Sequence, residues 1–182
     1  GGTVTSANLV IGAIQPYAGK YGISNDPTSF AVYGTDKYFT DKNTGTVLKL
    51  SGGLVEISRA NMIDYFRDIL QNLGGNEPVT TLSLSNEITG GFDIYQKNYV
   101  VTLGGLRTLH FDPLVNGWVS FQDYIPQLST SSQGQYYTFK NNAVWLQYSS
   151  NLYNNFYGKQ YGSSVDFVFN PIPTITKTFK IF

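Results

Sequence analysis

The only histidine of the chain, His110, is the first residue to consider for catalysis. Two carboxylates follow it closely in the sequence, Asp112 and Asp123, and either could orient an imidazole that acts as a general base. The chain has no cysteine and no Gly-x-Ser-x-Gly pattern to supply a nucleophile. We therefore favour a structural interpretation, in which His110 is a strand residue that points outward between apolar neighbours.

Paired carboxylates could hydrolyse a glycosidic bond, because that reaction needs two facing acidic side chains. The candidates lie on separate predicted strands or turns and share no local motif: Asp93, Asp112, Asp123 and Asp166. Residues 41–45 match the opening of a calcium-binding loop, but Gly52 stands where such a loop needs a bidentate Glu. A turn explains the Asp, Asn and Gly of this segment equally well. The sequence predicts no catalytic residue, no cofactor and no metal site.

Aromatic side chains with polar tips are concentrated in residues 154–161, among Asn and Gln side chains. This composition suits a carbohydrate-binding platform or a protein interface, although a β-turn flanked by core aromatic residues is the simpler interpretation. The candidate interface or glycan contacts are Trp118, Trp145, Tyr153, Phe156, Tyr157 and Tyr161.

Charge is scarce in this chain. Charged residues make up 13% of the sequence and the formal net charge is zero, against roughly 25% charged residues in ordinary soluble proteins. Sequence-independent binding of nucleic acid needs a cluster of basic residues, and no such cluster occurs. No apolar run approaches the roughly 20 residues that span a bilayer. A low charge density fits a chain that packs against neighbouring subunits.

The elements that must position these residues are mostly strands. Abundant Tyr, Phe, Thr and Gly with little charge predict an all-β fold. One inserted α-helix is predicted over about residues 60–73, with Ser58 as its N-cap, Gly74 and Gly75 at its end, and one face packed on a sheet or covering a sheet edge. Its apolar residues have helical spacing: Met62, Ile63, Phe66, Ile69, Leu70 and Leu73.

A hairpin pattern occurs twice, over residues 38–51 and 136–149. Each copy has an aromatic-rich strand, a Lys-Asn turn and a returning apolar strand. A weaker third copy begins at Tyr99, and residues 53–57 and 117–121 share the pattern of a further strand. Such units of roughly 40 residues are typical of propeller blades or related antiparallel β repeats. Because three partial units are too few to close a propeller, either other segments complete the ring or the units form an open β array, and we favour the first.

Composition also divides the chain. Residues 1–30, rich in Gly, Ser, Asn and Pro, predict an extended or irregular N-terminal arm. Residues 31–182 predict a β-repeat, propeller-like module. It is expected to be part of a larger chain, because the sequence begins at Gly1 without Met and ends within a strand-like alternation over residues 174–182. Two glycine pairs, Gly90–Gly91 and Gly104–Gly105, predict turns or bulges.

Residues 91–182 contain a series of short motifs in a fixed order. The series begins with Tyr-Val-Val-Thr-Leu at 99–103, Leu-His-Phe-Asp at 109–112, Gly-Trp-Val-Ser-Phe-Gln-Asp-Tyr-Ile-Pro at 117–126 and Tyr-Tyr-Thr-Phe-Lys-Asn at 136–141. It continues through Asn-Phe-Tyr-Gly at 155–158, Ser-Ser-Val at 163–165, Phe-Asn at 169–170 and Lys-Thr-Phe-Lys at 177–180. This series resembles virion structural proteins of tailed bacteriophages, and residues 38–66 look like a blade from the same proteins. The family resembled most is the tail muzzle, or nozzle, protein of crAss-like short-tailed phages.

The resemblance implies a non-catalytic role in the virion. Proteins of this kind form rings with propeller portions at the distal end of the tail tube. The expected partners are copies of the same chain and other tail proteins, with genomic DNA passing through the ring without sequence-specific binding. The alternative function is a glycan-binding module for host adhesion, on the tryptophans and tyrosines named above.

Overall fold

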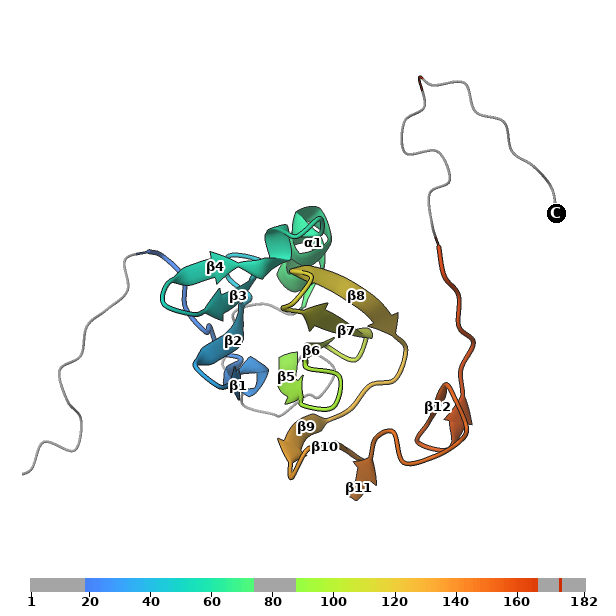
Figure 1. The fold of residues 1–182 in the computed structure, drawn as a ribbon. Coiled ribbons are helices and arrows are strands. Elements are labelled where there is room, and N and C mark those ends of the chain that lie inside the picture. Colours follow the sequence, from blue (N-terminus) through green and yellow to red (C-terminus); the bar gives the residue numbers. More distant parts are fainter. Residues whose placement is uncertain (1–18, 74–87, 167–173, 175–182) are drawn as a thin grey trace, which may run out of the picture. The chain divides into compact units, whose positions relative to one another are not determined.

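Antiparallel strands in four separate sheets are the main regular structure of the described chain (Figure 1). The computed structural model describes residues 19–73, 88–166 and 174. The chain divides into two units, Gly1–Ser149 and Ser150–Phe182. Three of the sheets belong to the first unit and a short hairpin belongs to the second. The described residues contain one α-helix, so the predicted all-β fold with a single inserted helix is confirmed.

In every sheet, strands that are neighbours in sequence are neighbours in space. Sheet A contains β1 (Ala31–Tyr33), β2 (Asp36–Asp41), β3 (Thr46–Leu50) and β4 (Leu54–Glu56). Sheet B contains β5 (Ile88–Asp93), β6 (Asn98–Leu103), β7 (Arg107–Asp112) and β8 (Gly117–Gln122). Sheet C contains β9 (Leu128–Ser132), β10 (Gln135–Lys140) and β11 (Ala143–Leu146). The second unit contains β12 (Asn155–Phe156) and β13 (Lys159–Gln160). The predicted hairpins, their third copy and the two further strands are confirmed.

Tight turns set the register of these hairpins. Asn141 and Asn142, between β10 and β11, have φ angles of 52° and 59°. Positive φ at both central residues matches the right-handed twist of the flanking strands, and Asn tolerates that conformation better than most residues. In this copy the expected Lys-Asn turn is a two-residue turn of Asn141 and Asn142, because Lys140 still pairs with Ala143 in the sheet. The predicted turn at Gly104–Gly105 is also confirmed, with φ angles of 49° and 72°.

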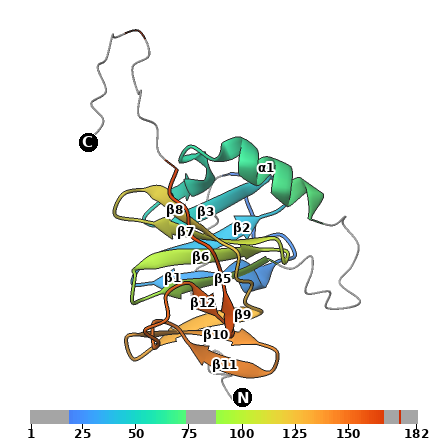
Figure 2. The same ribbon diagram turned by 90° about the vertical axis from the view of Figure 1, so that its right-hand side faces the viewer.

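Sheet B lies between the other two sheets of the first unit. Its first strand, β5, contacts β1 of sheet A and β9 of sheet C, and Figures 1 and 2 show the sheets on either side of it. All six residues of β6 are buried, as expected for a strand covered on both faces. The first strands of three successive sheets therefore adjoin one another.

The prediction of a turn or bulge at Gly90–Gly91 is wrong, because both residues lie within the regular pairing of β5. They allow two neighbouring segments to approach. A Cβ at Gly90 would overlap the backbone carbonyl of Ser29, and one at Gly91 would overlap the hydroxyl of Ser129. A glycine in a strand often marks such a close approach. Successive residues point to opposite faces, so the pair lets sheet B be covered on both sides.

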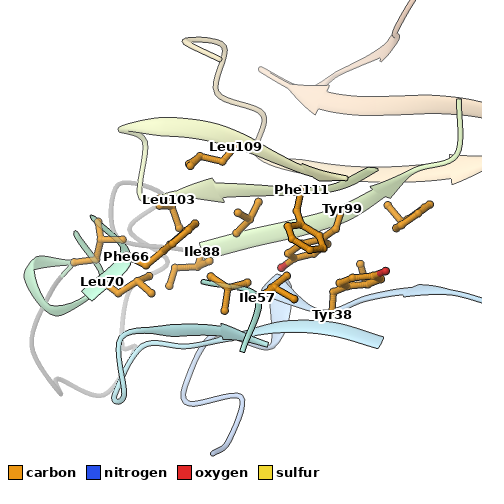
Figure 3. Packing of buried hydrophobic residues seen from close by; sticks show 14 residues of the cluster. Tyr38, Ile57, Phe66, Leu70, Ile88, Tyr99, Leu103, Leu109 and Phe111 are labelled. Carbon is orange, nitrogen blue, oxygen red and sulfur yellow. The ribbon is translucent and has the colours of Figure 1, made fainter. Parts of the chain in front are cut away.

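Apolar and aromatic side chains fill the space between sheets A and B (Figure 3). Tyr38 of β2 and Tyr99 of β6 are fully buried, and Tyr99 donates a hydrogen bond from its hydroxyl to the carbonyl of Ser29 at 2.8 Å. Tyr33 stacks on Phe92 with ring centroids 4.1 Å apart. These contacts join the two sheets through one continuous hydrophobic core.

The helix α1 (Ile63–Asn72) packs into this core through Phe66 and Leu70, both fully buried (Figure 3). It is shorter than the predicted 60–73, because Asn61 adopts a φ of 62° that the helix cannot include. Gly74 and Gly75 lie outside the described residues.

Ser58 is not the N-cap of the helix. It lies in the 3-10 turn η2 (Ile57–Arg59), and its buried hydroxyl accepts a hydrogen bond from the amide of Val47 at 3.2 Å. Met62 occupies the N-cap position without a side-chain hydrogen bond. The serine therefore stabilises the junction of η2 with β3 rather than the start of α1.

The segment before β1 lies on sheet A. The hydroxyl of Tyr21 donates to Glu56, the amide of Gly22 donates to Asp41 at 2.9 Å, and Ser24 accepts from the amide of Lys42 at 2.8 Å. The 3-10 turn η1 (Pro27–Ser29) follows and contacts β2 and β5. Residues 21–24 thus cover part of the face of sheet A that is turned away from sheet B, whereas η1 contacts both sheets.

Candidate interaction surfaces

His110 lies on the face of sheet B that is turned toward sheet C, together with Gly91 and Val100. Its side chain is 3% exposed, and its Nε2 lies 3.2 Å from the hydroxyl of Tyr124. Burial lowers the pKa of His110 to about 4. The prediction that His110 points outward is wrong, because this face of sheet B is covered at His110, where the imidazole lies against Tyr124.

The carboxylates considered as partners of His110 have other contacts. Asp112 accepts a hydrogen bond from the amide of Leu114 at 2.7 Å, which closes the turn between β7 and β8. Asp123 forms an ion pair with Arg107 at 3.4 Å, and both side chains are largely exposed. No group of three or more potential metal ligands occurs among the described residues. Asp112 is therefore a turn residue, and Asp123 is part of a surface ion pair.

The calcium-loop segment is a turn that binds backbone amides. One carboxylate oxygen of Asp41 accepts from the amides of Asn43 and Thr44, at 3.0 and 3.3 Å. The other accepts from the amide of Gly22 at 2.9 Å. Asp41 therefore closes the β2–β3 turn and holds the N-terminal segment, as the turn interpretation predicts.

Sheets B and C meet through polar side chains rather than through the hydrophobic core. The buried carboxylate of Asp93 accepts from the hydroxyl of Tyr148 at 2.5 Å and from the amides of Tyr95 and Gln96 at 2.9 and 3.1 Å. Burial raises the pKa of Asp93, although the hydrogen bond from Tyr148 opposes that shift. This carboxylate is a structural bridge between two sheets.

Serine and threonine hydroxyls complete that boundary. Ser131 of β9 donates to the carbonyl of Phe92 at 2.5 Å and accepts from the amide of Ile94 at 3.1 Å. On sheet B, Thr108 donates to the carbonyl of Tyr124 at 2.7 Å. Hydrogen bonds to neutral groups each contribute about 1 kcal/mol net, so this boundary depends on many small terms.

Trp118, proposed from the sequence as an interface or glycan contact, lies in β8 against the core. Its ring centroid is 4.5 Å from that of Phe66 and 5.3 Å from that of Phe111. Its indole N–H donates to the carbonyl of Ile57 at 3.1 Å. The other tryptophan, Trp145, lies in β11 of sheet C and is more exposed than Trp118.

The remaining candidate contacts belong to the hairpin of the second unit. Tyr157 and Gly158 form its turn, with φ angles of 55° and 77°. Phe156 and Tyr161 meet edge to face at 6.0 Å, and Lys159 lies 5.0 Å above the ring of Tyr161. Tyr153, just before the hairpin, is 87% exposed. Four of the six aromatic residues predicted as contacts are therefore grouped around one hairpin.

The outer face of sheet C is a further surface, which the sequence analysis did not identify. It is the face turned away from sheet B, and it carries apolar side chains in cross-strand rows: Leu128, Phe139 and Val144 in one row, and Thr130, Tyr137 and Leu146 in the next. Leu128, Val144 and Leu146 are exposed. The sequence does contain a sign of this surface. In β10 and β11, apolar or aromatic residues occur at odd as well as even positions, which is typical of strands covered on both faces.

The described residues contain no helix long and apolar enough to cross a membrane. A search of curated proteins finds no match. Residues 151–181 match the family model of the Crassvirus muzzle protein C-terminal domain. The match begins one residue after the start of the second unit, Ser150, and coincides with the C-terminal part of the resemblance found in the sequence. The match of this segment supports a crAss-like phage tail muzzle protein and indicates a component of the virion tail.

Proposed function

We propose that this chain is a non-catalytic structural component of the muzzle ring at the distal end of the phage tail, where it assembles with neighbouring subunits around the DNA exit channel. The observation that carries the proposal is the muzzle family match over residues 151–181. The candidates for chemistry have structural contacts that support the same conclusion: Asp41 and Asp112 close turns, and His110 bonds Tyr124.

We further propose that sheets A, B and C are successive blades of a propeller-like array, within a module that spans residues 31–182. Each sheet is a sequential antiparallel meander, and β1, β5 and β9 adjoin in chain order. First strands of successive blades adjoin in this way around a propeller axis. The two covered faces of sheet B support its place as an internal blade.

Cross-linking mass spectrometry of purified virions tests the assignment to the ring. We expect cross-links between copies of this chain and between this chain and other tail proteins, together with a copy number that matches a ring symmetry. Electron cryomicroscopy of the same particles should place the chain at the distal end of the tail. A protein that occurs in the virion only as isolated copies without neighbours of its own kind contradicts the ring.

Glycan binding is the second candidate function, and the exposed ring of Tyr153 beside the β12–β13 hairpin favours it. Exposed tyrosines present a flat apolar surface with a polar tip, which suits a sugar ring. A glycan array probed with the whole chain tests this function, with Tyr153→Ala as the matched variant. Equal background signal from both proteins excludes it, whereas a signal that the substitution removes supports host adhesion.

A further inference from the structure

The outer face of sheet C combines apolar residues with an absence of charge. The inner face of sheet C carries Ser131 and Thr138, which lie toward sheet B. The alternate residues of the three strands form the outer face: Leu128, Thr130, Ser132, Gln135, Tyr137, Phe139, Val144 and Leu146. None of the eight carries a charge. A sheet face that stays in water normally carries polar and charged side chains, so this composition indicates a covered surface.

The opposite end of the stack of sheets also carries apolar side chains. Tyr38 of β2 points toward sheet B, so its neighbours Lys37 and Phe39 lie on the outer face of sheet A. One cross-strand row there spans all four strands: Val32, Lys37, Leu50 and Leu54. The N-terminal segment covers the other end of this face, at Asp41 and Glu56. Val32, by contrast, is 50% exposed.

The internal boundaries specify a direction of packing. The face of sheet A that bears Tyr38 packs on sheet B, and the face of sheet B that bears Gly91 packs on sheet C. Among the described residues, two faces have no neighbouring sheet: the outer face of sheet C and the outer face of sheet A, of which the N-terminal segment covers one end. A contact between these two faces in different copies continues the same order of sheets. Such a contact is head-to-tail, and head-to-tail contacts close into rings when the rotation permits.

We infer that the outer face of sheet C docks on the outer face of sheet A of a second copy of this chain. This inference rests on the proposed ring and names the surfaces that build it. The outer face of sheet C is uncharged and the exposed row of sheet A carries one charge, so the apolar side chains of both gain from mutual burial, at roughly 25 cal/mol per Å² of apolar surface removed from water. Lys37 is the single charged residue of the sheet A row. Its ammonium group donates a hydrogen bond to the carbonyl of Thr35, in the turn between β1 and β2.

Cysteine cross-linking tests the inference directly, because the natural chain contains no cysteine. Val144→Cys places one thiol on sheet C and Val32→Cys places one on sheet A, both at exposed positions. We expect a flexible bismaleimide to give a covalent dimer when the two single variants are mixed. Neither single variant alone should give one, and the double variant should give a ladder of higher species. Leu114→Cys, in the exposed β7–β8 turn, replaces Val144→Cys as the control and should abolish the product.

Two other cross-linking results overturn the inference. A dimer formed by Val144→Cys alone means that two sheets C pack face to face. A cross-link from Val144→Cys in virions only to a different tail protein means that this protein covers the face. In a second measurement, Val144→Asp should abolish the native oligomer by mass photometry, while Leu114→Asp leaves it intact.

The failure of the inference is distinguishable from the failure of the proposed function. If the chain is found as a ring in purified tails but the mixed variants give no dimer, another surface builds the ring and only the inference fails. If the chain is absent from purified tails, the proposed function fails whatever the cross-linking shows.

Discussion

The rings of Tyr38 and Tyr99 stack with their centroids 4.9 Å apart and an interplanar angle of 14°, so that the second strands of two successive sheets meet through aromatic faces. Both side chains are fully buried. The contact lies at the centre of the hydrophobic core, and it is the point at which one repeat binds the next.

Removing the ring of Tyr99 should therefore destabilise the first unit strongly. We expect Tyr99→Ala to lower the free energy of unfolding by about 3–5 kcal/mol, the usual cost of deleting a buried aromatic side chain. Tyr99→Phe keeps the stack and removes only the hydrogen bond to Ser29, at a cost of about 1–2 kcal/mol. Urea denaturation measures both, and equal losses for the two variants would show that the stack contributes little.

Alanine substitutions at Gly90 and Gly91 in β5 should both destabilise the protein, the first by overlap with backbone atoms and the second by overlap with a side chain. Gly90→Ala meets the carbonyl of Ser29 and Gly91→Ala meets the hydroxyl of Ser129, so each should cost about 1–3 kcal/mol. Ser129→Gly should restore part of the stability of Gly91→Ala and none of that of Gly90→Ala. Gly53→Ala, which meets nothing within 4 Å, is the control. Thermal unfolding of the single and double variants measures these stability changes.

Acidification should destabilise the protein through His110. Its pKa is about 4 in the folded chain, below the ordinary value of 6.5, so the unfolded chain binds a proton more readily. The stability is complete above pH 6.5 and falls as the pH drops toward 4, by roughly 3 kcal/mol at most. The measurement is the free energy of unfolding from pH 7.5 to pH 4 for the wild type and for His110→Gln.

The variant should lose most of this pH dependence, whatever its stability at neutral pH. The carboxyl group of Asp93, whose pKa is raised, opposes the trend near its own titration range and contributes equally to both proteins. The comparison therefore isolates the histidine. Parallel profiles for the two proteins would contradict the assignment of the pH dependence to His110.

Sheet C should open before sheets A and B separate, because polar contacts rather than the hydrophobic core hold it. Tyr148→Phe removes the hydrogen bond to the buried carboxylate of Asp93, which should cost about 1–3 kcal/mol. Hydrogen exchange should show faster exchange in β10 while β6 stays protected. Tyr137→Phe is a matched control, since that hydroxyl donates to the exposed Gln135 within sheet C. Equal acceleration in β6 and β10 would show that all three sheets open together.

Local patterns in the sequence predicted most of the elements correctly. The repeated hairpin pattern predicted β2, β6 and β10, and its Lys-Asn turn lies in the structure at Asn141–Asn142, where Asn tolerates a positive φ. The helical spacing of Phe66 and Leu70 predicted α1. These patterns depend on residues within a few positions of one another, so they can be read from the sequence without knowledge of the fold.

The errors concern residues whose partners are distant in the sequence. Ser58 bonds to Val47 instead of capping the helix, Gly90 accommodates Ser29, and His110 is buried against Tyr124. In each case the neighbouring residues are compatible with either reading. The polar face of sheet B resembles a solvent-facing alternation, and only a second sheet on top of it makes that face internal.

The sequence by itself determined the β class, the repeated hairpins and the single helix, because periodicity and turn residues encode local conformation. The resemblance to muzzle proteins came separately, from the order of short motifs. Only the tertiary structure decided which faces of the sheets are covered. It shows that sheet B is internal, that Asp93 and His110 are buried, and that the outer face of sheet C is apolar and exposed. Burial depends on contacts between segments far apart in the chain, and a strand has the same local pattern whether its second face meets water or another sheet.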